Sequence, residues 1–124
     1  MMIWILLALG GAAGALARYA LASWVDQRTG SGFPLGTLVV NVIGAFLLGV
    51  VITGLATSAY QLQLGAFLAV GFLGDFTTFS TFAYETVMLG RQRQWGRALW
   101  YVLVSTGLTV LSVMGGMVCG TVLR

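Results

Sequence analysis

The sequence predicts an all-α integral membrane protein with four transmembrane helices, organised as one domain over residues 1–124. Only 7% of the 124 residues are charged and 59% are hydrophobic, whereas a soluble domain carries roughly 25% charged residues. Three long stretches, residues 1–17, 29–74 and 98–123, contain no charged side chain. Because a helix needs about 20 apolar residues to cross a bilayer, these stretches have room for four crossings and not for five.

Short polar segments at residues 26–32, 57–63 and 90–94 are the only plausible turns between the crossings. None of them is long enough to hold a soluble domain. We therefore place the four helices near residues 3–24, 33–56, 62–89 and 95–123. A cleaved signal peptide is an alternative for the first segment, but its apolar run is long and no positive charge precedes it. A retained helix is therefore expected.

Small residues recur at four-residue spacing within the predicted helices. The pairs are Gly10 with Gly14, Ala45 with Gly49, and Gly116 with Gly120. This spacing lets helix backbones approach closely in lipid, where no hydrophobic force drives helices together. We expect these pairs to be helix contacts. Because four helices leave little room for a path inside one chain, any pore is expected at a subunit interface of an oligomer.

The arginines predict an orientation for the chain. The turns after the first and third crossings carry Arg28, Arg91, Arg93 and Arg97, whereas the other side of the membrane has only Arg124. The positive-inside rule then places both termini outside. We interpret the cluster over residues 91–97 as an ordinary positive-inside anchor rather than as a lipid- or ligand-binding site.

The third crossing contains polar residues that a lipid-facing helix would not carry. Residues 71–82 read GFLGDFTTFSTF and place two glycines, one acid and four hydroxyls at the depth of the bilayer centre. Backbone freed from a helix at that depth is tolerated only where protein or a watery cavity satisfies it. We therefore predict a helix broken near residues 74–80 and an ion site there. The alternative is that the hydroxyls bond back to carbonyls four residues earlier and only bend the helix.

Other polar groups fall where they could line a path beside this break. Asn41 is a lone amide in the second crossing, and the fourth crossing has a polar residue at every fourth position, which places them on one face: Tyr101, Ser105 and Thr109. Phe79 and Phe82 can turn the positive edges of their rings toward a small anion. Singly, each polar group could equally hold helices together. Because these donors are neutral, the pattern is compatible with an anion path.

Three motifs in these segments resemble the Fluc/CrcB family of fluoride channels. They are GAAGALARY at residues 11–19, PLGTLVVN at 34–41 followed by Gly44 and Gly49, and GFLG at 71–74 followed by TTFSTF at 77–82. The motifs occur in the family's order on a chain of its length, and together they span practically the whole sequence.

The resemblance implies a fold and a function. Members of the family insert into the membrane in both orientations and assemble as antiparallel homodimers, with two fluoride pathways at the interface. They release fluoride passively from the cytoplasm, which gives fluoride resistance, and they hold a structural sodium ion at the dimer centre. For this chain, the resemblance implies a multi-pass protein of a bacterial inner membrane with fluoride, the lipid bilayer and a second copy as its partners.

The resemblance also implies roles for individual residues. The ion pathway would run along Asn41, Phe79, Ser80, Thr81, Phe82, Tyr101, Ser105 and Thr109. Phe79 and Phe82 would form its aromatic pair, and Asn41 would donate to fluoride. Gly74 and Thr77 would offer backbone carbonyls to sodium. Arg18 matches an arginine near the aqueous vestibule, although an arginine at that position could also simply extend to the lipid headgroups. Glu85 matches an acid whose role is left open.

Two features depart from the family pattern. Asp75 stands where a second glycine is expected, and its carboxylate could bind the cation, titrate, or cap the following half-helix; we favour capping. The arginine bias is the second departure, because insertion in both orientations requires nearly balanced turns. A heterodimer with a paralogue is therefore an alternative to the homodimer.

Two other functions are weighed against a channel. A proton-coupled exporter of the small multidrug-resistance kind needs a carboxylate in the first helix, where this chain has none. A non-transporting assembly subunit would use its polar residues only to join helices. Catalysis has the least support, because the chain has no histidine and its single cysteine, Cys119, is interpreted as apolar filler. With six basic residues in all, a nucleic-acid-binding face is not expected.

Overall fold

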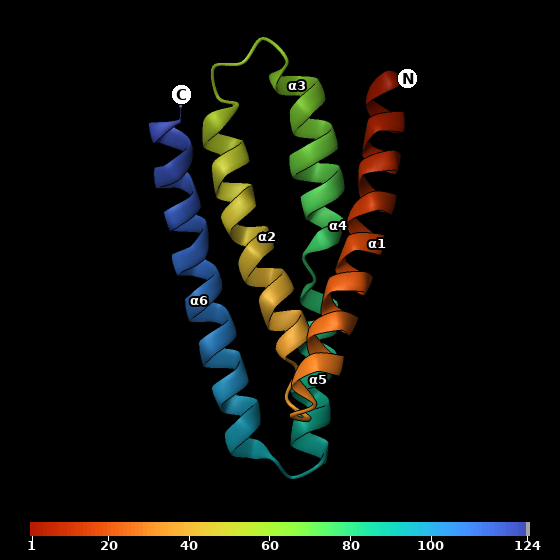
Figure 1. Cartoon of the computed structure of the whole chain (residues 1–124), viewed down its shortest axis with the longest axis vertical. Coiled ribbons are helices and arrows are strands. Elements are labelled where there is room, and N and C mark those ends of the chain that lie inside the picture. Colours follow the sequence, from red (N-terminus) through yellow and green to blue (C-terminus); the bar gives the residue numbers. More distant parts are fainter. Residues whose placement is uncertain (124) are drawn as a thin grey trace.

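The computed structural model describes residues 1–123, which form a bundle of four long helical segments (Figure 1). Each segment is long and apolar enough to cross a membrane: Met2–Thr29, Leu35–Gly54, Gln61–Arg91 and Trp95–Val122. The N-terminus and the end of α6 (Trp95–Val122) lie at one end of the bundle, and the connections after α1 and α5 lie at the other. The four predicted crossings are therefore confirmed. Arg124, which was used to predict the orientation of the chain in the membrane, lies outside the described residues.

Helix α1 (Met2–Thr29) runs five residues beyond its predicted end at residue 24. It ends at Gly30, which adopts the left-handed conformation that favours glycine (φ 54°, ψ 17°). The polar residues at 26–28, expected to form a turn, instead form the last helical turn. This extension has a structural role, because the Asp26 carboxylate accepts a hydrogen bond from the backbone N–H of Gly36 at 2.8 Å. Asp26 thereby satisfies a free amide at the start of the second helix.

Helix α2 (Leu35–Gly54) packs along helix α6 (Trp95–Val122) through small residues. At Gly116 and Gly120 an added methyl group would collide with the α2 backbone at Phe46 and Val50. At Gly49 it would collide with the backbone of α6. The predicted glycine contacts of the second and fourth crossings are therefore confirmed. Cys119 lies on the same helix but is exposed, so it does not fill the core as expected.

The third crossing consists of four consecutive pieces. They are α3 (Gln61–Leu64), the π-helix η1 (Gly65–Leu73), α4 (Gly74–Phe76) and α5 (Phe79–Arg91). A π-helix is rare and often occurs at functional sites, and nothing in the sequence pattern predicted it. Helix α1 packs against η1, where Gly10 and Gly14 leave room for the backbone of residues 67–72. This contact confirms the third pair of small residues.

The helix is interrupted at Thr77 and Thr78, within the predicted range. Both residues have extended backbones, with ψ angles of 157° and 123°. The Thr77 hydroxyl does bond back to the carbonyl of Leu73 at 3.0 Å, as the bent-helix alternative requires. The helix nevertheless stops there instead of merely bending. Thr77 and Thr78 therefore separate an upper half of the crossing, up to Phe76, from a lower half that begins at Phe79 (Figure 1).

Two buried clusters hold this interruption in place. Val40, Leu73 and Phe76 pack together on the upper side, and the lower cluster joins α2, α5 and α6 through Leu38, Leu89, Ala98 and Tyr101. Most other large apolar side chains are exposed on the outer faces of the bundle, which suits a lipid environment. The interruption is thereby fixed beside α2 and α6.

Candidate ion site at the interrupted helix

A groove of about 390 Å³ lies beside the interruption, between α2, the start of α5 and α6. It brings together five of the eight residues expected along the pathway: Asn41, Phe79, Phe82, Ser105 and Thr109. Ser80 and Thr81 do not line it, whereas their neighbour Thr78, which was not expected there, does. Thr77 also lines it. Residues separated by up to 68 positions in the sequence thus meet at one place in the membrane-spanning region.

Asn41 satisfies the backbone that the interruption sets free. The N–H of Thr78 donates to Oδ1 of Asn41 at 2.7 Å, and Nδ2 of Asn41 donates to the carbonyl of Thr78 at 2.9 Å. An amide nitrogen carries two N–H groups, so one donor of Asn41 is left over after this pairing. Asn41 therefore stabilises the break and still offers a neutral donor in the groove.

Thr78 also begins the lower half-helix. Its hydroxyl accepts a hydrogen bond from the backbone N–H of Thr81 at 3.2 Å, which makes Thr78 the N-cap of α5. The same hydroxyl lies 3.0 Å from that of Thr81 and 3.4 Å from that of Ser80. Ser80 and Thr81 thus join a hydroxyl cluster next to the groove, although they do not line it.

The expectation that Asp75 caps the following half-helix is wrong, because Thr78 occupies that role. Asp75 lies in the short helix α4 and is exposed in the single chain. Its carboxylate lies against Gly11 of α1, where a side chain would collide with it. A glycine on α1 therefore makes room for the acid that replaces the expected glycine on the third crossing.

Three aromatic rings lead from the open side of the groove into the core. The rings of Phe79 and Phe82 are 5.7 Å apart and tilted by 49°. Phe82 in turn lies 5.1 Å from the ring of Tyr101. Phe79 is 79% exposed and Tyr101 is fully buried. The predicted aromatic pair is therefore brought to the groove, with its outer ring uncovered.

The hydroxyl of Ser105 has no hydrogen-bond partner within the described chain, although the residue is only 5% exposed. Buried polar groups are nearly always paired, so an unpaired one indicates a missing ligand or water. Ser105 lines the groove together with Thr109, one turn farther along α6. The wall of the groove thus contains a hydroxyl that has no partner among residues 1–123.

Tyr101 does not line the groove, and its hydroxyl makes a different contact. It donates to one carboxylate oxygen of Glu85 at 2.7 Å, and the hydroxyl of Thr37 donates to the other at 2.9 Å. Thr37 is buried and was not predicted from the sequence. Its position one helical turn before Asn41, on the same face of α2, was the signal that could have found it.

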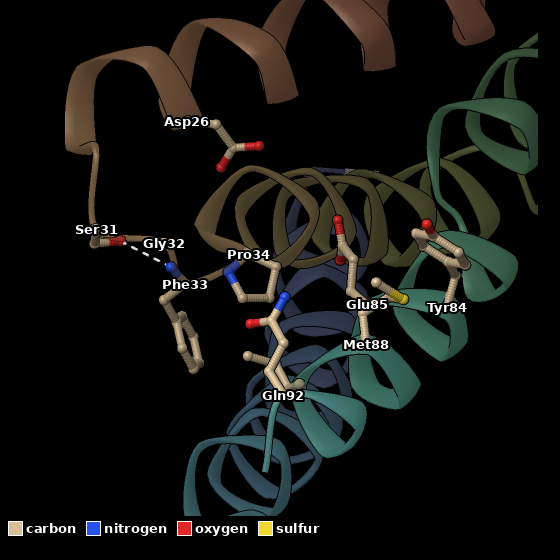
Figure 2. A pocket seen from close by; sticks show the side chains of 10 residues that line it. Asp26, Ser31, Gly32, Phe33, Pro34, Tyr84, Glu85, Met88 and Gln92 are labelled. Carbon is tan, nitrogen blue, oxygen red and sulfur yellow. Dashed lines mark hydrogen bonds between the residues drawn. The ribbon is translucent and has the colours of Figure 1, made fainter. Parts of the chain in front are cut away.

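Thr37, Tyr101 and Glu85 form a hydrogen-bonded triad. Glu85 also lines a second cavity, of about 320 Å³, at the end of the bundle. Figure 2 shows Glu85 and Met88 of α5, and Gln92 just after its end, opposite Asp26 of α1 and the loop at residues 31–34. The loop is ordered by a hydrogen bond from the N–H of Phe33 to the hydroxyl of Ser31 at 3.3 Å. Polar groups therefore continue from the interruption to the end of the bundle through Tyr101 and Glu85.

The two carbonyls expected to hold sodium have both lost their helical partners. In a continuous helix the N–H of Thr78 would bond to the carbonyl of Gly74, and the N–H of Thr81 to that of Thr77. Here Asn41 and the Thr78 hydroxyl take these two N–H groups. The carbonyl oxygens of Gly74 and Thr77 thereby lose these helical partners, although that of Thr77 accepts a long hydrogen bond from Arg18. Oxygen atoms are the ligands that a hard cation prefers.

Arg18 lies near one of these carbonyls. Its guanidinium donates to the carbonyl oxygen of Thr77 at 3.5 Å, a long hydrogen bond, and the residue is half-buried. The side chain therefore reaches the interruption from α1. Its place near an aqueous vestibule stays a prediction.

Comparison with known proteins gives consistent matches. The family described as "CrcB-like protein, Camphor Resistance (CrcB)" matches residues 5–117. The chain is similar to proteins named fluoride-specific ion channel FluC from Geobacter metallireducens, with 48% identity over 87% of this chain and 91% of that protein, and from Thermus thermophilus, with 45% identity over 87% and 85%. The FluC of Acidobacterium capsulatum is 43% identical over 95% and 94%.

Proposed function

The chain belongs to the CrcB family of fluoride-specific ion channels, as its motifs predicted, and we propose that the groove beside Thr77 and Thr78 is its ion pathway. The chain is a fluoride channel and not an enzyme. The pathway releases fluoride passively from the cytoplasm, across the inner membrane of a bacterial cell, and so gives resistance to the ion. The main support for this assignment of the groove is the buried hydroxyl of Ser105, which can donate a hydrogen bond and has no acceptor among the described residues.

Neutral donors suit the permeation of a small, strongly hydrated anion. A bare charge in a low-dielectric interior costs several kcal/mol unless donors replace its water. The spare N–H of Asn41, the hydroxyls of Ser105 and Thr109, and the ring edges of Phe79 and Phe82 supply such replacements without a full positive charge. Conduction requires that an ion can leave as well as enter, and neutral donors hold it less tightly than an arginine would.

Efflux from liposomes that contain the purified protein tests this function. We expect fluoride to leave much faster than chloride. Ser105→Ala should slow fluoride efflux at least about tenfold, because a hydrogen bond to a charged group contributes roughly 1.5–3 kcal/mol. Ser112→Ala is the matched control, since its hydroxyl on the same helix is already bonded to the carbonyl of Val42 at 2.7 Å. Equal efflux of both ions, or equal effects of the two variants, would contradict the assignment.

A second copy of the chain, inverted in the membrane, is proposed to close the groove. Phe79 is largely exposed and Asp75 is uncovered at mid-membrane depth, where a lipid-facing carboxylate is costly. An antiparallel dimer with two-fold symmetry would cover both residues and create two equivalent pathways.

The exposed thiol of Cys119 tests this arrangement. Labelling it from each side of the membrane should modify roughly half of the chains from either side. Complete labelling from one side, together with a dependence on a second gene product for efflux, would support a heterodimer with a paralogue instead.

Sodium is proposed as a structural ion at the centre of this dimer. The released carbonyls of Gly74 and Thr77 from both copies would hold it, and the ion would neutralise dipoles that converge there. We expect the purified dimer to melt at a higher temperature in sodium than in choline at equal ionic strength. The same melting temperature in both salts would remove sodium from the proposal without affecting the fluoride pathway.

A further inference from the structure

A second groove, away from the ion pathway, lies between α5 and α6 where the two helices meet at their turn. Its volume is about 750 Å³, and it shares no lining residue with the groove at the interruption. Val87, Leu99 and Val102 give it an apolar wall, and Arg91 and Arg93 lie at the end formed by the turn. No carboxylate lines it. The groove is therefore apolar along the crossing and cationic at its end.

The two arginines of this groove differ from the other described arginines. Arg18 binds a backbone carbonyl, Arg28 stacks on the ring of Trp24, and Arg97 donates to Gln94 and to the carbonyl of Ser31. Within residues 1–123, Arg91 and Arg93 make no side-chain hydrogen bond and no ion pair. Their charge is thus available to a ligand.

The turn that carries these arginines has an unusual backbone. Arg93 has a φ of 57°, a left-handed conformation that normally belongs to glycine at the end of a helix. The turn is closed by hydrogen bonds from Arg93 to Gly90 at 3.0 Å and from Gln94 to Leu89 at 2.9 Å. Gly90 lies so close to the ring of Trp95 that a methyl group would come within 2.9 Å of it. Arg93 therefore occupies a backbone conformation that favours glycine, in a turn that packs against the ring of Trp95.

We propose that this groove binds one anionic phospholipid of the surrounding leaflet. The phosphate lies between Arg91 and Arg93, and an acyl chain follows Val87, Leu99 and Val102 along the crossing. Trp95 is the first residue of α6, and tryptophan is favoured where a crossing meets the membrane–water interface. Basic pockets between transmembrane helices are suited to anionic headgroups. An ordinary positive-inside anchor, the interpretation from sequence, needs charge at this end but no groove.

Native mass spectrometry of the intact purified protein tests the site, with phosphatidylglycerol and phosphatidylcholine of identical acyl chains as probes. We expect about 30-fold tighter binding of phosphatidylglycerol, since each arginine near the membrane surface contributes about fivefold. Arg91→Gln and Arg93→Gln should each reduce this preference about fivefold, and the double variant should abolish it. The double lysine variant, which keeps both charges, should retain most of the preference.

Arg28→Gln is the matched control, because Arg28 lies in the last turn of α1 and does not line the groove. The end of α1 and the turn after α5 lie at the same end of the bundle (Figure 1). The control variant should leave the preference unchanged. A preference that survives in the double glutamine variant, or that falls equally in Arg28→Gln, would overturn the proposal. Displacement of phosphatidylglycerol by an equal concentration of inorganic phosphate would assign the arginines to a soluble anion and also overturn it.

Discussion

The pair formed by α2 and α6 contains two neighbouring stretches that differ sharply. Toward the chain termini, glycines at positions 49, 116 and 120 bring the two backbones together, and the nearby hydroxyls of Thr53 and Ser112 are bonded to carbonyls. Toward the middle of the crossings, a groove lies beside Asn41 and Ser105 of the same two helices, and the buried hydroxyl of Ser105 has no partner among the described residues. The close-packed stretch holds the two helices together, whereas the unpaired hydroxyl lines the groove that we propose as the ion pathway.

The largest effect is expected from breaking the close-packed stretch. Gly116→Val would drive a branched side chain into the backbone of Phe46, and overpacking at backbone does not relax easily. We expect almost no monodisperse protein after extraction in detergent, as measured by size-exclusion chromatography. Gly107→Val is the control on the same helix, since a methyl group there meets no atom within 4 Å. If both variants fold equally well, the contact at Gly116 is not structural.

The next largest effect is expected from breaking the hydrogen bonds by which Asn41 of α2 holds Thr78 at the interruption. Asn41→Ala removes the partners of both the N–H and the carbonyl of Thr78, and each buried group left unpaired costs about 1–3 kcal/mol. Fluoride efflux should fall about 100-fold in liposomes, with some loss of thermal stability. A variant that keeps full efflux would show that the break does not depend on Asn41.

A smaller effect is expected at the triad below the groove. Thr37→Val deletes one of the two hydrogen bonds to Glu85 and leaves the bond from Tyr101 in place. The loss of one such bond corresponds to roughly 0.5–1.5 kcal/mol, so efflux should fall between about twofold and tenfold. A loss as large as that of Asn41→Ala would place Thr37 in the pathway itself.

The smallest effect is expected at Asp75. Asp75→Asn keeps the shape of the side chain and removes its charge, and no conducting donor of the groove contacts it. Fluoride efflux should stay within about threefold of the original rate and should not require a pH gradient. Loss of transport in this variant, together with dependence on a pH gradient, would favour the proton-coupled exporter over a channel.

The sequence predicted the crossings and the break because their signals are local. Charge-free stretches locate helices in a membrane, and the glycine, acid and hydroxyls of residues 71–82 locate the interruption. The pairing of Asn41 with Thr78 joins residues 37 positions apart, and no local pattern specifies such a contact. The hydrogen bond from the Gly36 N–H to the Asp26 carboxylate was not predicted for a similar reason, because it depends on how two helices meet at a turn. The π-helix η1 packs against α1, and no local pattern in the sequence predicted it.

The reciprocal bonds between Asn41 and Thr78 have a mechanical consequence. Reversing the side-chain amide would set nitrogen against N–H and oxygen against oxygen, so only one orientation is stable. The second N–H of the Asn41 side chain therefore points in one fixed direction. In the proposed pathway, fluoride would therefore move to and away from a donor whose position is fixed.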